Sequence, residues 1–157
     1  MGKILAELRQ SKPFPRPEPE ALVTLLRTSD VVRGRIEETL KPWGLSPEQY
    51  NVLRILRGAP DGCHPTLEIA ARMVSRAPNI TRLIDKLIRK GLVTRCGAEG
   101  DRRVVMIRIA PAGQKVLAEA TPALDRVNVA CGGGLSPAKL RTLIRSLNAI
   151  RKAARDG

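Results

Sequence analysis

The chain has 157 residues, a net charge of +13, and only one Trp, one Tyr and one Phe. Its length suits one compact domain with extensions, and a core rich in Leu, Ile, Val and Ala favours packed helices over a β-sandwich or barrel. The positive charge exceeds what solubility requires and indicates an anionic partner. Nucleic acid is the first candidate, and an acidic membrane surface is the second.

The cysteine and histidine content excludes several kinds of site. Cys63, Cys96 and Cys131 are too few and too scattered for a disulfide framework or a CxxC metal site, and His64 is the only histidine. We therefore expect three buried or idle thiols and no cofactor or metal. The sequence offers no nucleophile–base pair and no phosphate loop, so we predict that the protein is not an enzyme. No stretch approaches the roughly 20 apolar residues of a membrane span, which predicts a cytoplasmic protein with no membrane association.

The first 19 residues have the composition of an N-terminal arm. A short amphipathic stretch around Ile4 and Leu5 runs into prolines at every second position from Pro13 to Pro19, a spacing that favours extended chain. This arm either packs on a partner subunit or is mobile. Apolar residues then recur at helical spacing over residues 20–41, which predicts a first long helix.

A second helix is predicted to begin after Ser46. Ser46 can cap the helix, Pro47 suits its first turn, and Gln49 completes a capping box with Ser46. The apolar residues that follow are spaced for one buried face, and Gly58 marks the end of the helix. This start signal is among the strongest in the chain.

The next segment has the order of a helix-turn-helix. Thr66 is expected to cap a short third helix over residues 67–73, and a turn over residues 74–77 leads into a fourth helix from about residue 78 to residue 90. Gly91 is placed to adopt the left-handed conformation past the end of the fourth helix. The basic character of this fourth helix indicates a recognition helix.

The fourth helix has two different faces. One face is a continuous apolar stripe formed by Ile80, Leu83, Ile84, Leu87 and Ile88. The opposite face is polar and basic and carries Asn79, Arg82, Lys86 and Arg89. A helix of this kind packs its apolar face in the core, and its other face fits the major groove of B-DNA.

Two short strands follow, over residues 92–95 and 104–109, and the hairpin between them is predicted to be a wing. Pro111 then opens a fifth helix, and Ser136 caps a sixth after a run of three glycines. The predicted fold is therefore mainly α with a small β wing, a winged helix-turn-helix flanked by long helices.

The exposed residues of this unit suit contacts with double-stranded DNA. Asn79 can form a bidentate contact with adenine and Arg82 with guanine, whereas Lys86 suits a phosphate. Asp101 is expected to pair with a neighbouring arginine and to stabilise the wing. The candidate DNA-binding residues are Arg76, Pro78, Asn79, Thr81, Arg82, Lys86, Arg102 and Arg103.

A basic helix face is more often a solvated surface than a binding surface, so this pattern alone is weak. Residues 72–108, however, hold ten basic side chains against three acidic ones, and the excess coincides with the helix-turn-helix and wing. Sequence-specific DNA binding is therefore the leading interpretation. The alternative is a basic protein that coats nucleic acid without specificity, or an architectural protein without an effector.

Residues 72–109 resemble the DNA-binding half of the multiple-antibiotic-resistance regulator (MarR) family. The resemblance is carried by the segments NITRLIDKL at residues 79–87, KGLV at residues 90–93, and DRRVV at residues 101–105. The last segment is similar to the wing motif of the family, an Asp followed two places on by an Arg. With the helices on either side, the resemblance extends over nearly all of residues 20–155.

This resemblance implies a homodimeric transcriptional regulator, commonly a repressor, that binds a pseudo-palindromic operator and is released by a small aromatic anionic effector. It places Arg82 and Thr81 in the major groove and Arg103 in the minor groove, and it places the effector between the first, second and fifth helices. The implied division is an N-terminal arm (1–19), a first dimerisation helix (20–45), a winged helix-turn-helix domain (46–110) and C-terminal dimerisation helices (111–157). The cysteine near the first helix that senses oxidants in some members has no counterpart here.

Overall fold

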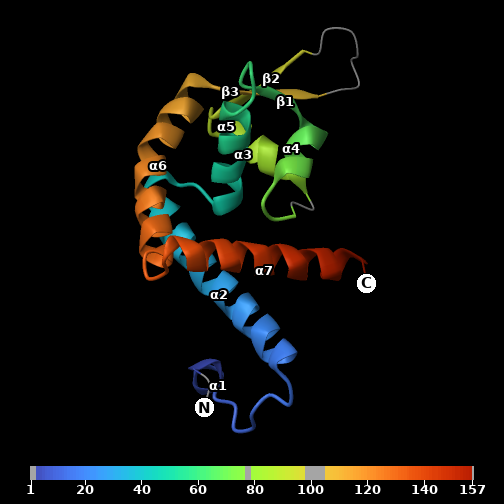
Figure 1. Ribbon diagram of the computed structural model, residues 1–157. Helices are drawn as coiled ribbons and strands as arrows, with labels where there is room; N and C mark the ends of the chain where they lie inside the picture. Colours follow the sequence, from blue (N-terminus) through green and yellow to red (C-terminus); the bar gives the residue numbers. More distant parts are fainter. Residues whose placement is uncertain (1–2, 77–78, 98–104, 157) are drawn as a thin grey trace.

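The computed structural model describes residues 3–76, 79–97 and 105–156, and its elements follow the predicted order (Figure 1). The chain runs through α1 (Lys3–Glu7), α2 (Pro17–Leu40), the 3-10 helix η1 (Lys41–Trp43), α3 (Pro47–Arg57), β1 (Cys63–Pro65), α4 (Thr66–Arg72), α5 (Ile80–Arg89), β2 (Val93–Cys96), β3 (Met106–Ile109), α6 (Pro111–Gly132) and α7 (Pro137–Asp156). This arrangement confirms the predicted fold class, mainly α with a small β unit.

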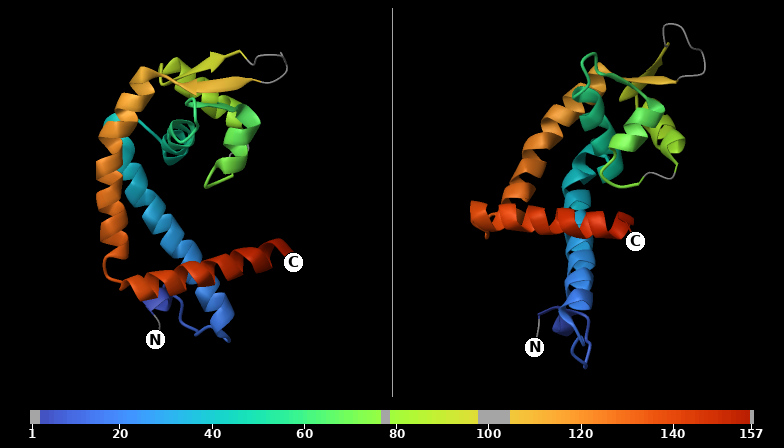
Figure 2. Two further views of the ribbon diagram at one scale, coloured as in Figure 1. Left: turned by 45° about the horizontal axis from the view of Figure 1, so that its top comes forward. Right: turned by 45° about the vertical axis from the view of Figure 1, so that its right-hand side comes forward.

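The elements separate into a compact part and an extended part. Helices α3, α4 and α5 gather with the three strands at one end, while α2 and α6 run beside each other from this unit and α7 crosses α2 (Figures 1 and 2). The compact part contains the predicted helix-turn-helix and the strands that lead into the wing. The long helices α2, α6 and α7 lie outside this compact part.

The core lies where α3, α4, α5, the sheet and α6 meet. The apolar stripe predicted for α5 faces inward, with Ile84 and Leu87 buried. Burying such a side chain contributes roughly 1.5–3 kcal/mol. The fully buried side chains that surround this stripe include Leu53, Leu56, Ile69, Ile107 and Leu117.

The predicted capping box at the start of α3 is confirmed. The Ser46 hydroxyl accepts a hydrogen bond from the Gln49 backbone amide at 3.2 Å, and the Gln49 side-chain oxygen accepts one from the Ser46 amide at 3.2 Å. Lys90, at the end of α5, donates to the same Gln49 oxygen at 3.0 Å and to the carbonyl oxygen of Gly44. The start of α3 is thereby joined to the end of α5.

The sheet has one strand more than the sequence indicated. Its order is β1-β3-β2, and both pairings are antiparallel. Strand β1 has three residues and ends in Pro65, so it gives no alternating pattern from which it could be predicted. The expected cap at Thr66 is wrong, because Pro65 occupies the N-cap position and the Thr66 hydroxyl and amide both donate to the Val105 carbonyl. Thr66 therefore extends the pairing of β1 with β3.

The N-terminal arm is shorter than predicted. Helix α2 begins at Pro17, so Pro17 and Pro19 lie in its first turn instead of in extended chain. Proline is tolerated there because the first amides of a helix have no acceptor within it, and Glu18 and Glu20 favour the positive end of the helix dipole. Residues 3–7 form the short helix α1, in which Ile4 and Leu5 are buried.

The long helices leave apolar surface uncovered. Only Leu40 is buried in α2, and no residue of α7 is buried. Leu26 on α2 is 70% exposed and Ile144 on α7 is 56% exposed. Within the ranges that the structure describes, no helix combines the length and the apolar character needed to cross a membrane.

The junction between β2 and α6 generates a prediction at Gly113. A Cβ atom at Gly113 would overlap the carbonyl oxygen of Leu92, which also accepts a hydrogen bond from the Ala110 amide. We expect Gly113→Ala to lower the free energy of unfolding by about 1–3 kcal/mol, as overpacking of a tight contact does. Urea denaturation followed by circular dichroism measures this loss.

Gly34→Ala is the matched control, because a Cβ at that helical position meets no atom within 4 Å. It is expected to leave stability unchanged or to raise it by up to about 1 kcal/mol, since alanine favours helix more than glycine does. Equal unfolding curves for the two variants would contradict the close packing of α6 on β2.

Candidate nucleic-acid interface

Helix α5 is held at both ends by local interactions. At its start, the Asn79 side-chain oxygen accepts a hydrogen bond from the Arg82 amide at 3.1 Å. At its end, Gly91 takes the left-handed conformation with φ +67°, as predicted, and the Leu92 amide donates to the Leu87 carbonyl at 3.0 Å. These two caps fix the length of the helix, and burial of the apolar stripe fixes its rotation.

The structure leaves most of the predicted DNA-binding residues exposed on α5 or directly before it. Thr81, Arg82 and Lys86 are exposed on α5, Asn79 is exposed at its N-cap, and Arg76 is exposed in the turn before it. Among the other predictions, Pro78, Asp101, Arg102 and Arg103 lie outside the described residues.

The capping role of Asn79 changes what this residue can offer to DNA. A bidentate contact with adenine needs both the oxygen and the nitrogen of the side-chain amide. The oxygen is already the acceptor for the Arg82 amide. The cap uses one of the two lone pairs of this oxygen and fixes the orientation of the amide, so the remaining lone pair and the two N–H groups are what Asn79 can offer to a base.

Several cations of this region are engaged within the protein. Arg72 pairs with Glu68 at 2.5 Å, Arg95 pairs with Asp85 at 2.7 Å, and Arg108 donates to the Asp61 carbonyl at 2.8 Å. Lys90 is bound to Gln49 and Gly44. The cations that make no ion pair with any acidic residue in the described ranges are Arg76, Arg82, Lys86 and Arg89.

The turn between α4 and α5 is held by Asn51, a residue that the sequence analysis did not predict to have this role. The Val74 amide donates to the Asn51 side-chain oxygen, which lies on α3, at 2.8 Å. Asn51 sits inside a regular helical pattern, so nothing local marks it as a partner of a turn 23 positions away. This bond connects α3 with the segment that leads into the recognition helix.

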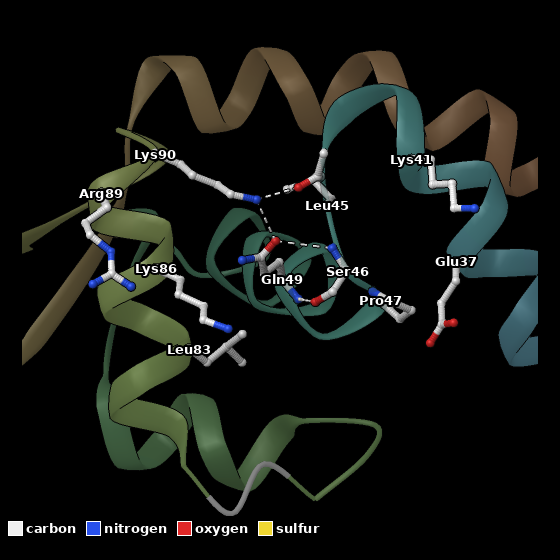
Figure 3. A pocket seen from close by; sticks show the side chains of 11 residues that line it. Glu37, Lys41, Leu45, Ser46, Pro47, Gln49, Leu83, Lys86, Arg89 and Lys90 are labelled. Carbon is white, nitrogen blue, oxygen red and sulfur yellow. Dashed lines mark hydrogen bonds between the residues drawn. The ribbon is translucent and has the colours of Figure 1, made fainter.

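A basic hollow of about 720 Å³ lies beside the C-terminal half of α5 (Figure 3). Its walls come from α5, from the loop before α3 and from the end of α2. Lys86 and Arg89 reach it from α5 and Lys41 from the opposite side, while Glu37 supplies an acidic group at the rim. The free cations of the helix thus border a recess in the surface.

A second cavity of about 480 Å³ lies between α2, α3, α6 and the turn at residues 73–75. Arg33 pairs there with Glu48 at 2.7 Å and with Glu37 at 2.9 Å. Burial opposes ionisation of Glu48, but the hydrogen bond from Arg33 together with backbone contacts outweighs it and lowers the pKa of this carboxyl. Arg54 also lines the cavity and makes no ion pair within the described residues.

All three cysteines are free thiols, but the fold brings two of them together. The Sγ atoms of Cys63 and Cys96 lie 2.8 Å apart, although the two residues are 33 positions apart in the chain. No local pattern predicts this pair, because the contact depends on the pairing of both β1 and β2 with β3. Cys131 is exposed on α6. No group of three or more potential metal ligands occurs in the described part of the chain.

Comparison with known proteins identifies a family. A sequence model of the MarR family matches residues 45–105. YpoP of Bacillus subtilis (strain 168), an uncharacterized HTH-type transcriptional regulator, is 37% identical over 95 residues, which are 60% of this chain and 65% of YpoP. The match thus covers slightly less than two thirds of this relative.

Solved structures are similar over more of the chain. A MarR transcription factor from Planctomyces limnophilus is 37% identical, with 87% of this chain and 99% of that protein covered and a TM-score of 0.65. A MarR variant from Escherichia coli in complex with operator DNA has a similar fold, with 21% identity, a TM-score of 0.70, and 83% of this chain and 95% of that one covered.

The cap at Asn79 generates a stability prediction. We expect Asn79→Ala to lower the free energy of unfolding by about 1 kcal/mol, because the Arg82 amide loses its acceptor. Asn79→Ser retains a capping oxygen and should stay within a few tenths of a kcal/mol of the parent. Urea unfolding curves of the three proteins make the comparison, and an alanine variant as stable as the parent would contradict the cap.

Proposed function

The chain belongs to the MarR family of winged helix-turn-helix transcriptional regulators, and we propose that it is a homodimeric, ligand-responsive repressor of a pseudo-palindromic operator. Members of this family bind DNA and act as dimers. The observation that carries the proposal is the row of cations on α5 that pair with no acidic residue in the described part of the chain, on a helix whose opposite face is buried.

The proposed DNA contacts divide by chemistry. Arg82 lies in the first turn of α5 and is proposed to read a guanine, since a guanidinium matches the two acceptors on its major-groove edge. Lys86 and Arg89, further along the helix, are proposed to bind phosphates, with Arg76 before the helix. The proposed major-groove set also includes Thr81, Pro78 and the side-chain amide of Asn79. Arg102 and Arg103 are proposed to enter the minor groove, and Asp101 is proposed to stabilise the wing by pairing with a neighbouring arginine.

Dimerisation is proposed for the long helices. Residues 20–45 and 111–157 supply α2, α6 and α7, whose exposed apolar side chains would be covered by a second copy of the chain. Residues 46–110 would form the DNA-binding domain, and the residues before α2 an arm. Two-fold symmetry would then place two α5 helices in successive major grooves, about 34 Å or one helical turn apart.

The cavity between α2, α3 and α6 is proposed as the effector site. Its volume, about 480 Å³, is within the range of small-molecule sites. Tyr50 and Leu124 provide apolar wall, and Arg54 provides a cation that has no acidic partner in the described residues. An aromatic carboxylate matches this combination of one apolar wall and one free guanidinium.

The same cavity offers a route from effector to DNA. Its lining includes Asn51 and Val74, the two residues whose hydrogen bond braces the helix-turn-helix. A ligand that binds better when this brace is displaced would shift the recognition helix and favour the DNA-free state. Release of DNA requires only that the ligand bind with different affinities to the turn with the Asn51–Val74 hydrogen bond and to the turn without it.

Selection of bound duplexes from a random pool, at roughly physiological salt, tests the proposed function. We expect an inverted repeat with half-sites about one helical turn apart, bound at least about 10³-fold more tightly than random DNA. Arg82→Ala should cost about 1–3 kcal/mol and relax specificity at one base pair in each half-site. The matched control is Arg126→Ala on α6, which removes the same charge outside the proposed interface and should change the affinity less than threefold.

No enriched sequence, despite tight binding at low salt, would contradict a specific regulator and would favour a protein that coats nucleic acid. If Arg82→Ala and Arg126→Ala lost the same affinity for the selected DNA, net charge alone would determine DNA binding.

The effector site generates a separate prediction. In isothermal titration against a panel of aromatic carboxylates, we expect at least one ligand whose affinity falls tenfold or more in Arg54→Gln. The control Arg57→Gln, one helical turn nearer the end of α3 and outside the cavity lining, should bind that ligand like the parent. Absence of binding across the panel, or equal losses in both variants, would contradict this site while leaving the DNA-binding proposal intact.

A further inference from the structure

Two thiols meet at the base of the hairpin that leads into the wing. Strands β1 and β2 flank β3, with Cys63 opposite Arg108 and Cys96 opposite Met106. Residues 106 and 108 are two positions apart, so this register puts both cysteines on one face of the sheet. Their sulfur atoms are 2.8 Å apart, and each residue is partly exposed.

We propose that Cys63 and Cys96 are an oxidisable pair whose reversible disulfide clamps β1 to β2 and stabilises the DNA-binding unit without abolishing DNA binding. The statement that DNA binding persists after oxidation rests on the proposed function. The sulfur atoms need to approach by less than 1 Å to reach the bond length of about 2.0 Å. Because β3 lies between β1 and β2, formation of the bond would draw the two outer strands toward each other across β3.

The disulfide would close a loop around the whole helix-turn-helix. Cys63 begins β1, directly before α4, and Cys96 ends β2, shortly after α5. A covalent link between these positions restricts the unfolded chain over the segment that holds both helices. It leaves the exposed face of α5 unchanged, since neither cysteine lies on that helix.

The reaction needs an oxidant, and a hydroperoxide is the class we propose. The Cys96 sulfur attacks a peroxide oxygen, the O–O bond breaks, and Cys96 becomes a sulfenic acid while an alcohol or water leaves. The Cys63 sulfur then attacks the Cys96 sulfur, the S–O bond breaks, and the oxygen leaves as water with the proton of the Cys63 thiol. The two sulfurs together lose two electrons, and the peroxide gains them.

The order of these steps follows from the surroundings of Cys63. Burial, together with the contact to Cys96, raises the pKa of Cys63 to about 11, although Arg108 acts against the shift. Cys63 is therefore a thiol at neutral pH, and the thiolate is the form that reacts with peroxide. Cys63 is thus the poorer first nucleophile, and the proposed order gives it the resolving step.

The test uses the full chain with Cys131→Ser, which removes the exposed third thiol and prevents links between molecules. After treatment with hydrogen peroxide, mass spectrometry is expected to show a loss of two hydrogens, a tryptic cross-link between Cys63 and Cys96, and full recovery with dithiothreitol. The oxidised protein should melt about 5–15 °C above the reduced protein. Its affinity for the selected operator should stay within threefold of the reduced value.

Cys63→Ser and Cys96→Ser in the same background are the controls. Neither should form the cross-link or gain in melting temperature, and only Cys63→Ser should accumulate a sulfenic acid that dimedone traps at Cys96. Two thiols that both remain open to alkylation after peroxide treatment would overturn the proposal, as would loss of operator binding on oxidation. If the reduced protein selects no operator, the proposed function fails, whereas the cross-link and melting results still decide whether the clamp exists.

Discussion

The apolar stripe of α5 packs against α3 and the sheet, and the position of the proposed DNA contacts on this helix depends on that packing. Ile84 and Leu87 together bury enough surface to contribute roughly 3–6 kcal/mol, several times more than an exposed ion pair contributes. Rotation of the helix about its axis would expose these side chains, so its outward face is fixed. The cap at Asn79 and the turn at Gly91 add less energy, but they fix where the helix starts and ends.

Only some of the positive charges of the chain are available to bind an anionic partner. A net charge of +13 attracts any polyanion, and by itself it distinguishes neither a regulator from a coating protein nor one face from another. Contacts within the protein distinguish one basic face from another, because Arg72 and Arg95 are held in ion pairs and Lys90 is held by the Gln49 side-chain oxygen. Within residues 72–108, the described cations whose side chains have no ion-pair or hydrogen-bond partner among the described residues lie along α5 and the turn before it. Exposed ion pairs contribute at most about 1 kcal/mol each, so their effect is to orient side chains more than to stabilise the fold.

Local signals in the sequence predicted local structure well. The capping box at Ser46, the two faces of α5 and the left-handed Gly91 were each predicted from residues within one or two turns, and each is confirmed. The features that were missed depend on pairing over long distances. Strand β1, the true role of Thr66, the brace from Asn51 and the Cys63–Cys96 contact all arise when segments separated by 20 or more positions meet. A sequence pattern of period 2 or 3.6 carries no information about such meetings.

The proposed effector site, the proposed dimer surface and the position of the recognition helix all depend on how α2, α3 and α6 are arranged. The cavity is bounded by these helices, the apolar surface left for a second subunit lies on two of them, and the turn before α5 is attached to the third through Asn51. A shift of α3 relative to α2 therefore changes the cavity and the recognition helix together. Coupling between two binding sites is reciprocal, so whatever factor an effector imposes on DNA affinity, DNA imposes the same factor on effector affinity. Any ligand that lowers the affinity for the operator must consequently bind more weakly to the operator complex than to the free protein, by the same factor.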